Sequence, residues 1–325
     1  MMKRTFLALA LLAVTSPVQA DSRPADSLKI LVTNDDGLTS NLVALYGALK
    51  AEGHDVLVSV PCTGQSGRGG ALVMYSTTVI VADNDKTQID AEGGCHNGAA
   101  PIGAPAVGAM TRAGYNNGDF YYVHGTPVMA TMYGLDVLAR ARWGGAPDLV
   151  LSGPNEGQNV GIIVNHSGTI GNTQFALGRG LAAIALSAGT NTVDNTTLND
   201  PDSKIVAAQA VRLIRALRAG ARAGRPMLPE GVSLNVNFPN TVTTETDFAF
   251  ARIGSFQLYN LVFRNSPPYG LGATFNDVNT ATEAQRYDES VVSATRISVS
   301  AMQVSFDHSP AAEYWLARTL KRLFR

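Results

Sequence analysis

Residues Leu28 to Gly37 read LKILVTNDDG, an apolar run that ends in two adjacent carboxylates and a glycine. A short run of β-formers that stops at turn residues is typical of the first strand of an α/β sheet, and such sheets bind ligands at the carboxyl ends of their strands. Two adjacent aspartates repel each other, and a divalent cation would allow Asp35 and Asp36 to remain ionised together. The pattern indicates a metal site. Asn, Asp and Gly also form ordinary turns, and the tetrapeptide by itself slightly favours that interpretation.

Strands and helices alternate along the next two hundred residues. We expect strands at 56–60, 120–123, 148–151, 182–186 and 234–238, and helices at 41–51, 127–139 and 204–218. This alternation predicts the α/β class, with a Rossmann-like, doubly wound, mostly parallel sheet that carries helices on both faces. We place this domain at residues 21–245.

The last eighty residues differ in style. Extended runs occur at 248–253, 257–263 and 291–304, and they are followed by a helical segment at 311–324 that carries Trp315 and several leucines. We therefore expect residues 246–325 to form a smaller C-terminal β appendage with a final docking helix.

The first twenty residues have the layout of a secretory signal peptide. Lys3 and Arg4 precede an apolar stretch at 6–14, and Val18-Gln19-Ala20 precedes a polar segment. We expect cleavage after Ala20 and a periplasmic or secreted mature protein. No later segment is long and apolar enough for a membrane span.

Composition restricts the partners. The 325 residues are 45% hydrophobic and 16% charged, with a net charge of −1, so one large domain or a domain with an appendage can form a sizeable core. Interspersed charges give no reason to expect binding to a nucleic-acid polymer or to a membrane surface, and small molecules are the more suitable partners.

The only cysteines are Cys62 and Cys95. In an oxidising compartment they could form a disulfide, and two free thiols are the alternative.

Three more loops follow predicted strands or open a predicted helix. They span residues 64–70, 152–159 and 165–169, and they are rich in Gly, Asn and Ser. By the rule that ligands bind at the carboxyl ends of parallel strands, we expect these loops to gather at one edge of the sheet with Asp35 and Asp36.

The ordered motifs resemble those of the SurE family of survival proteins, which are metal-dependent nucleoside monophosphate phosphatases. They are TNDDG at 33–37, P-x-x-x-x-SG at 61–67, GTP at 125–127, SGPNEGQN at 152–159, HSGT at 166–169, AIALS at 183–187 and LNVNFP at 234–239. Each motif alone is weak, but the ordered set covers most of residues 28–239. The resemblance implies a nucleotidase of the acid-phosphatase type, which acts on small phosphomonoesters and assembles as a homodimer or higher homo-oligomer.

The resemblance also implies a ligand set for a divalent metal. The family's metal ligands fall on Asp35, Asp36, Ser66 and Asn155. Two carboxylates, a hydroxyl and an amide oxygen suit Mg²⁺ or Mn²⁺, and the surrounding residues cannot form a His-rich or Cys-rich zinc site. Asp35 and Asp36 are the candidate catalytic residues, one of which would orient or deprotonate a metal-activated water.

A separate set of donors is predicted for the phosphate. Ser167, Gly168 and Thr169 open a helix, where hydroxyls, amide groups and the positive end of the helix dipole would bind an anion, and Asn159 is a further candidate. The alternative for the helix start is a simple cap, which the residues support equally well. Asn155 and Asn159 could also merely stabilise turns of their Gly-rich loop.

Residues 91–117 look like an insertion relative to compact members of the resembled family. The insertion contains Cys95, and Cys62 stands where the family commonly has Asp. We expect a Cys62–Cys95 disulfide to tie the insertion to the base of the Ser66 loop, at the rim of the active site. Residues 38–42 also replace the family's usual Ala-Pro-Gly segment, which affects expected base contacts more than the metal. The C-terminal region matches only loosely, which makes dimerisation through it less certain.

The sequence is interpreted as an exported phosphomonoesterase that hydrolyses nucleoside monophosphates. One rival is an exported protein that binds phosphate or a nucleotide without hydrolysis, and another is an enzyme of altered reaction on the same scaffold. A pure anion binder gains little from paired aspartates aimed at an anion, so the carboxylates favour the enzyme.

Overall fold

The computed structural model describes residues 27–73, 93–221, 226–266, 270–304 and 309–323. The predicted signal peptide, residues 1–20, lies outside these ranges. The first strand, β1 (Lys29–Thr33), is almost completely buried, and its side chains alternate between the two faces of a central sheet. Ile30 and Val32 belong to the larger hydrophobic core, and Leu31 belongs to a smaller one on the opposite face.

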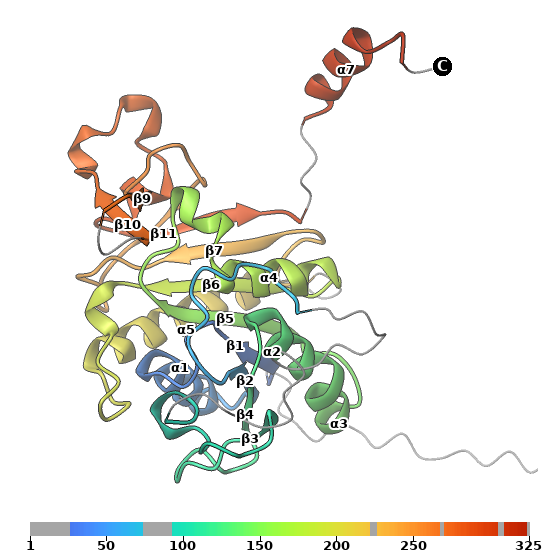
Figure 1. The fold of residues 1–325 in the computed structure, drawn as a ribbon, viewed down its shortest axis with the longest axis vertical. Helices are drawn as coiled ribbons and strands as arrows, with labels where there is room; N and C mark the ends of the chain where they lie inside the picture. The colour runs from blue at the N-terminus through green and yellow to red at the C-terminus, as the bar shows by residue number, and fades with distance from the viewer. Residues whose placement is uncertain (1–26, 74–92, 222–225, 267–269, 305–308, 324–325) are drawn as a thin grey trace, which may run out of the picture.

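The central sheet contains nine of the described strands, in the order β3-β4-β2-β1-β5-β6-β7-β11-β8 (Figure 1). Their bounds are β2 Asp55–Pro61, β3 Val107–Ala109, β4 Phe120–Val123, β5 Leu149–Glu156, β6 Ala183–Ala188, β7 Ser233–Asn237, β8 Phe248–Ala251 and β11 Ile297–Met302. The six strands from β4 to β7 in this order pair in parallel, whereas β3 and β11 pair antiparallel with β4 and β7. The predicted doubly wound, mostly parallel sheet is confirmed.

Helices cover both faces of this sheet. The bounds of the helices are α1 Ser40–Ala51, α2 Pro127–Tyr133, α3 Ala139–Trp143, α4 Gly168–Gly178, α5 Pro201–Gly220, α6 Glu289–Val292 and α7 Pro310–Thr319. On one face α1 packs beside α5 over the larger core; on the other face α2 packs beside α4. None of the described helices has the length and apolar character needed to cross a membrane.

Two helices begin at residues other than those expected. Thr39 caps α1 through its side chain, so the helix begins at Ser40, one residue before the expected start. Asp200 caps α5 by accepting a hydrogen bond from the Ser203 amide. The helix therefore begins at Pro201, three residues before the expected start. Pro201 explains this difference, because proline fits the first position of a helix.

The predicted insertion contributes a strand and several buried side chains to the fold. Of its described residues, 107–109 form the edge strand β3, and Ala99, Ala100 and Met110 are buried in the larger core. No strand was expected in this segment, because a strand of three residues is too short to produce a periodic pattern.

The C-terminal region contributes both to the sheet and to a separate element. Strands β8 and β11 lie at the end of the central sheet, whereas β9 (Tyr259–Arg264) and β10 (Gly270–Phe275) form a two-stranded antiparallel hairpin. The final helix α7 is present, and it stands away from the rest of the chain in Figure 1. Its apolar side chains are exposed in the single chain, including Trp315 and Leu323.

Candidate functional site

The predicted site residues lie where the direction of chain winding changes. The chain proceeds from β1 through β2 to β4 on one side, and from β5 through β6 to β7 on the other, so the switch point lies between β1 and β5. Asp35 and Asp36 follow β1, Ser66 follows β2, and Asn155 is at the end of β5. Since β2, β1 and β5 are neighbours, the sheet brings all three segments to one edge, as the switch-point rule predicts.

Asp35 is buried against the start of α4. The hydroxyl of Thr169 donates to Asp35 Oδ1 at 2.7 Å, and the backbone amides of Gly168 and Thr169 also donate to this carboxylate. A side chain at position 168 would prevent this approach, because a Cβ there would lie 2.6 Å from the Cβ of Asp35. Burial raises the pKa of Asp35, and the hydrogen bonds from the helix start counteract part of that rise.

Asp36 lies among carboxylates. Burial raises its pKa well above the ordinary value, and the nearby negative charges of Asp35 and Glu156 raise it further. One counteracting donor is the backbone amide of Glu156, 3.4 Å from Asp36 Oδ2. Among the ion pairs formed by described residues, none joins Asp35 or Asp36 to a lysine or arginine. A cation would offset this negative charge, and protonation of one carboxylate would also relieve it.

The loop that carries Ser66 is attached directly to the aspartate loop. The Gln65 amide donates to the carbonyl of Asp35 at 2.7 Å, and the Gly69 amide donates to the carbonyl of His166 just before α4. Ser66 itself is exposed, so its hydroxyl is accessible at the surface of the site. The backbone contacts fix the loop while its side chain remains free for a ligand.

Asn155 is half-buried at the end of β5. Its amide nitrogen donates to the carbonyl of Gly157 at 2.8 Å. Because that contact occupies a donor, it leaves the amide oxygen available as an acceptor for a cation.

Most of the predicted phosphate donors already form hydrogen bonds within the protein. Ser167 caps α4 by accepting a hydrogen bond from the Ile170 amide, while the Gly168 and Thr169 amides serve Asp35. Asn159 is buried; its amide donates to Ser187 Oγ, and its backbone N–H donates to Asn237 Oδ1. Phosphate binding by these four residues stays a prediction. Of the helix-start donors, the Ser167 hydroxyl proton is the one that these contacts leave available.

The residues present fit a hard divalent cation. Two carboxylates, a hydroxyl and an amide oxygen come from three neighbouring strand ends, which is an oxygen-only set of the kind that Mg²⁺ or Mn²⁺ prefers. Within the described ranges, no three His, Cys, Asp or Glu side chains form a metal cluster. That finding agrees with a set in which only two of four ligands are of those types.

The Cys62–Cys95 disulfide is present, as expected, with the two Cα atoms 4.6 Å apart. It joins the insertion to the end of β2, immediately before the Ser66 loop. The next residue, His96, lies against the aspartate loop, where its Nδ1 is 3.0 Å from the carbonyl oxygen of Asp36. Sequence reasoning missed both His96 and Glu156. The adjacency of His96 to a bonded cysteine was the available signal.

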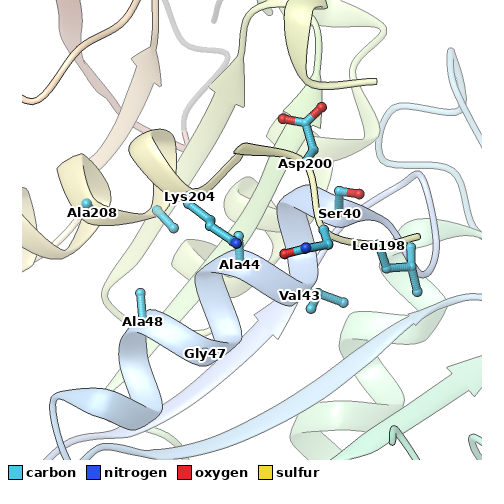
Figure 2. A pocket seen from close by; sticks show the side chains of 11 residues that line it. Ser40, Val43, Ala44, Gly47, Ala48, Leu198, Asp200, Lys204 and Ala208 are labelled. Carbon is cyan, nitrogen blue, oxygen red and sulfur yellow. The ribbon is translucent and has the colours of Figure 1, made fainter. Parts of the chain in front are cut away.

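Two cavities lie near the described sheet. One, of about 330 Å³, lies between parts of α1 and α5 and is lined mainly by small or apolar side chains. Figure 2 shows Lys204 extending from α5 towards Ala44 on α1. It contains none of the predicted site residues. The other, of about 470 Å³, lies beside the 152–159 loop. Its lining includes Gln158, Asn240 and the aromatic rings of Tyr259 and Phe275 from the hairpin.

Comparison with known proteins identifies relatives along most of the chain. The profile described as survival protein SurE matches residues 30–260. An acid phosphatase of Yarrowia lipolytica is 34% identical over 73% of this chain and 68% of its own length. A 5'-nucleotidase SurE of Polaromonas naphthalenivorans is 30% identical over 91% of this chain and 98% of its own length.

A solved structure shows the same fold. The crystal structure of the SurE protein from Aquifex aeolicus superposes with a TM-score of 0.61 at 23% identity, covering 91% of this chain and 99% of that one. The extent of the profile match and the identity to the relatives agree with the ordered motifs at the sheet edge. The chain belongs to the SurE family.

Proposed function

We propose that the chain is a divalent-metal-dependent phosphomonoesterase that hydrolyses nucleoside monophosphates. The observation that carries the proposal is the position of Asp36, whose carboxylate lies among those of Asp35 and Glu156 at the switch point of the sheet. The names of the relatives, acid phosphatase and 5'-nucleotidase, support phosphatase chemistry on a nucleotide.

Asp35, Asp36, Ser66 and Asn155 would hold Mg²⁺ or Mn²⁺. The bound cation would supply charge stabilisation for a phosphate oxygen and a lowered pKa for a bound water. Asp35 is held by Thr169 and the start of α4, so its role is to stay ionised in a fixed orientation. Asp36 has the weaker protein contact, 3.4 Å from the Glu156 amide, and we assign it as the acceptor of the proton from the attacking water.

The charge on the transferred phosphate requires donors besides the cation. The positive end of the α4 dipole points at the site, and the Ser167 hydroxyl would donate to an equatorial phosphate oxygen. Asn159 would contribute through the rigid loop that it anchors rather than as a mobile donor, because its amide is bonded to Ser187.

The nucleoside would occupy the cavity of about 470 Å³ beside the 152–159 loop. This volume is within the usual range for small-ligand sites, and the rings of Tyr259 and Phe275 provide an apolar wall for a base. The hydroxyl of Tyr259 donates to Gln158 Oε1 at 3.0 Å, which connects that wall to the loop that carries Asn155.

The test is release of inorganic phosphate from a panel of 5' and 3' nucleoside monophosphates. We expect activity that is abolished by a chelator and restored by Mg²⁺ or Mn²⁺. Tight nucleotide binding without phosphate release would instead support an exported binding protein. Turnover of another ester class without phosphate release would support an altered reaction.

We also propose that the protein acts outside the cytoplasm as a homo-oligomer. The N-terminal pattern supports export, and N-terminal sequencing of the protein from a periplasmic or culture fraction should begin at Asp21. Exposed apolar residues on α7, including Tyr314 and Trp315, support association with a second copy. Light scattering should give a multiple of the chain mass, and deletion of residues 309–325 should lower it.

A further inference from the structure

The Cys62–Cys95 disulfide fixes a short segment of the insertion at the rim of the candidate site. Both cysteines are buried, and Ala99 and Ala100 just after Cys95 are packed in the larger core. The Cys95 amide donates to the carbonyl of Ala100 at 2.9 Å, which closes the segment into a compact turn. The residues within that turn are held in place from both ends.

At this position His96 contacts two loops. Its backbone amide donates to the carbonyl of Cys62 at 2.8 Å. Its ring Nδ1 lies 3.0 Å from the carbonyl oxygen of Asp36, and its Nε2 lies 3.5 Å from the amide nitrogen of Gly64. A carbonyl can only accept and an amide N–H can only donate, so in this arrangement Nδ1 donates to the Asp36 carbonyl and Nε2 accepts from the Gly64 amide.

The loops on either side of His96 carry predicted metal ligands. Asp36 is itself a ligand, and Gly64 is two residues before Ser66. The next residue, Asn97, strengthens the connection, because its amide donates to the carbonyl of Leu38 at 2.6 Å. Gly37 has a φ of +88°, and a Cβ there would lie 3.1 Å from the carbonyl oxygen of Pro61, so the aspartate loop passes close to the end of β2.

We propose that His96 is a positioning residue for the metal site, and that the Cys62–Cys95 disulfide is what holds it there. The ring sets the separation between the Asp36 loop and the Ser66 loop through their backbones, without touching the metal. This inference rests on the proposed metal dependence and adds a residue from the insertion to it. Groups that orient metal ligands affect affinity by about 10-fold to 100-fold when they are removed.

The experiment measures Mn²⁺ binding directly, by calorimetry and by the loss of the free Mn²⁺ signal in electron paramagnetic resonance. His96→Ala is expected to weaken Mn²⁺ binding by about tenfold, because both loop contacts are lost. His96→Asn can still donate to the Asp36 carbonyl, and it should recover most of the affinity. Ile102→Ala is the matched control, because Ile102 is 62% exposed in the same insertion and should leave affinity unchanged.

The role of the disulfide is tested by a double-mutant cycle. Replacing both cysteines by serine should weaken Mn²⁺ binding in the otherwise unaltered chain. In the His96→Ala background the same replacement should change affinity by less than about twofold, because a shared mechanism makes the two effects non-additive. Circular dichroism and thermal unfolding establish that each variant is folded before its affinity is compared.

The outcomes separate this inference from the proposed function. If the unaltered protein binds no Mn²⁺, the metal-dependent function fails, and the role of His96 fails with it. If the unaltered protein binds Mn²⁺ and His96→Ala binds it equally well, the inference alone is overturned. Weak binding by both His96→Ala and His96→Asn, with additive effects of the cysteine replacement, also overturns it.

Discussion

Two pairs of adjacent acidic residues occur in this chain, and they have different surroundings. Asp35-Asp36 follows β1, and Asp288-Glu289 stands at the start of α6. Asp288 accepts hydrogen bonds from the Arg252 guanidinium at 2.9 Å and from the Ser255 and Phe256 amides at 2.8 and 2.9 Å. Asp36 has a single amide contact, at 3.4 Å, and two neighbouring carboxylates.

The difference between the pairs lies in their partners. Asp288 is neutralised by a cation from its own chain and joins Arg252 to the following turn, so it has the contacts of a structural residue. Asp36 lies near two other carboxylates, which destabilise its ionised form. Of the two pairs, the one without a lysine or arginine partner among the described residues is therefore the better candidate for a metal site.

The largest expected effect is on activity at the first pair. Asp36→Asn should lower kcat/KM by about 1000-fold, equivalent to about 4 kcal/mol, because it removes a metal ligand and the proposed proton acceptor. Stability of the metal-free protein should be unchanged or higher, since charge repulsion with Asp35 and Glu156 is relieved. Phosphate release and urea unfolding measure the two effects. Full hydrolysis by this variant with saturating Mn²⁺ would show that the central assignment is wrong.

The second prediction concerns Glu289, whose pKa is raised to about 7 by burial, against 4.5 for an ordinary glutamate. Between these values the folded chain keeps a proton that the unfolded chain has released. The free energy of unfolding should therefore fall as pH rises from about 4.5 to about 7, and this contribution should be level above pH 7. At about 1.4 kcal/mol per pKa unit, the full decrease is about 3 kcal/mol.

Comparison with Glu289→Gln isolates this contribution from those of other carboxylates. Urea unfolding of both proteins between pH 5 and pH 8 should show the unaltered chain losing stability relative to the variant as pH rises. Parallel pH profiles for the two proteins would exclude a buried, protonated Glu289.

The third prediction concerns the structural member of the second pair. Asp288→Asn should lower the free energy of unfolding by about 2 kcal/mol, because one acceptor of backbone N–H groups is replaced by a donor and the attraction to Arg252 is lost. Arg252 is largely exposed, so most of this effect comes from the backbone contacts. Phosphatase activity per folded molecule should be retained. A large loss of activity without loss of stability would contradict the distinction between the two pairs.

The first pair could be predicted from the sequence because its signals are local. An apolar strand that ends in NDDG places both aspartates at a sheet edge, and the switch-point rule brings Ser66 and Asn155 there from neighbouring strands. The same local information predicted a mostly parallel sheet, but it did not predict the order of the strands within it. It also could not distinguish whether the start of α4 binds a phosphate or Asp35, because that depends on a contact across more than 130 residues.

The second pair was not recognised, since its partners are distant in the sequence. Arg252 lies 36 residues before Asp288, and the amide that contacts Glu289 Oε1 belongs to Gly161, 128 residues away. The contacts of His96 likewise join segments that are distant in the sequence, since the neighbouring disulfide links cysteines 33 residues apart. Long-range packing of this kind leaves no periodic pattern in the chain, and only the folded structure shows it.

The smallest expected effect concerns the cavity of about 470 Å³ beside the 152–159 loop. Gln158 lines it from the 152–159 loop, and Ser293 and Ala294 line it from the end of α6, after the second pair. Phe275→Ala should raise KM for nucleoside monophosphates by about fivefold, with kcat nearly unchanged, because a stacking ring of the wall is lost.

Phe263→Ala is the matched control for that prediction. Phe275 is 71% exposed and Phe263 is 77% exposed, both on the β9–β10 hairpin, and only Phe275 lines the cavity. Neither substitution removes much buried surface, so the two variants should be equally stable. Steady-state kinetics with a nucleoside monophosphate and with a small phosphomonoester that lacks a base separate the cases, because Phe275→Ala should affect only the first substrate. An equal rise in KM for both variants would assign the effect to the hairpin as a whole and remove the cavity from the substrate site.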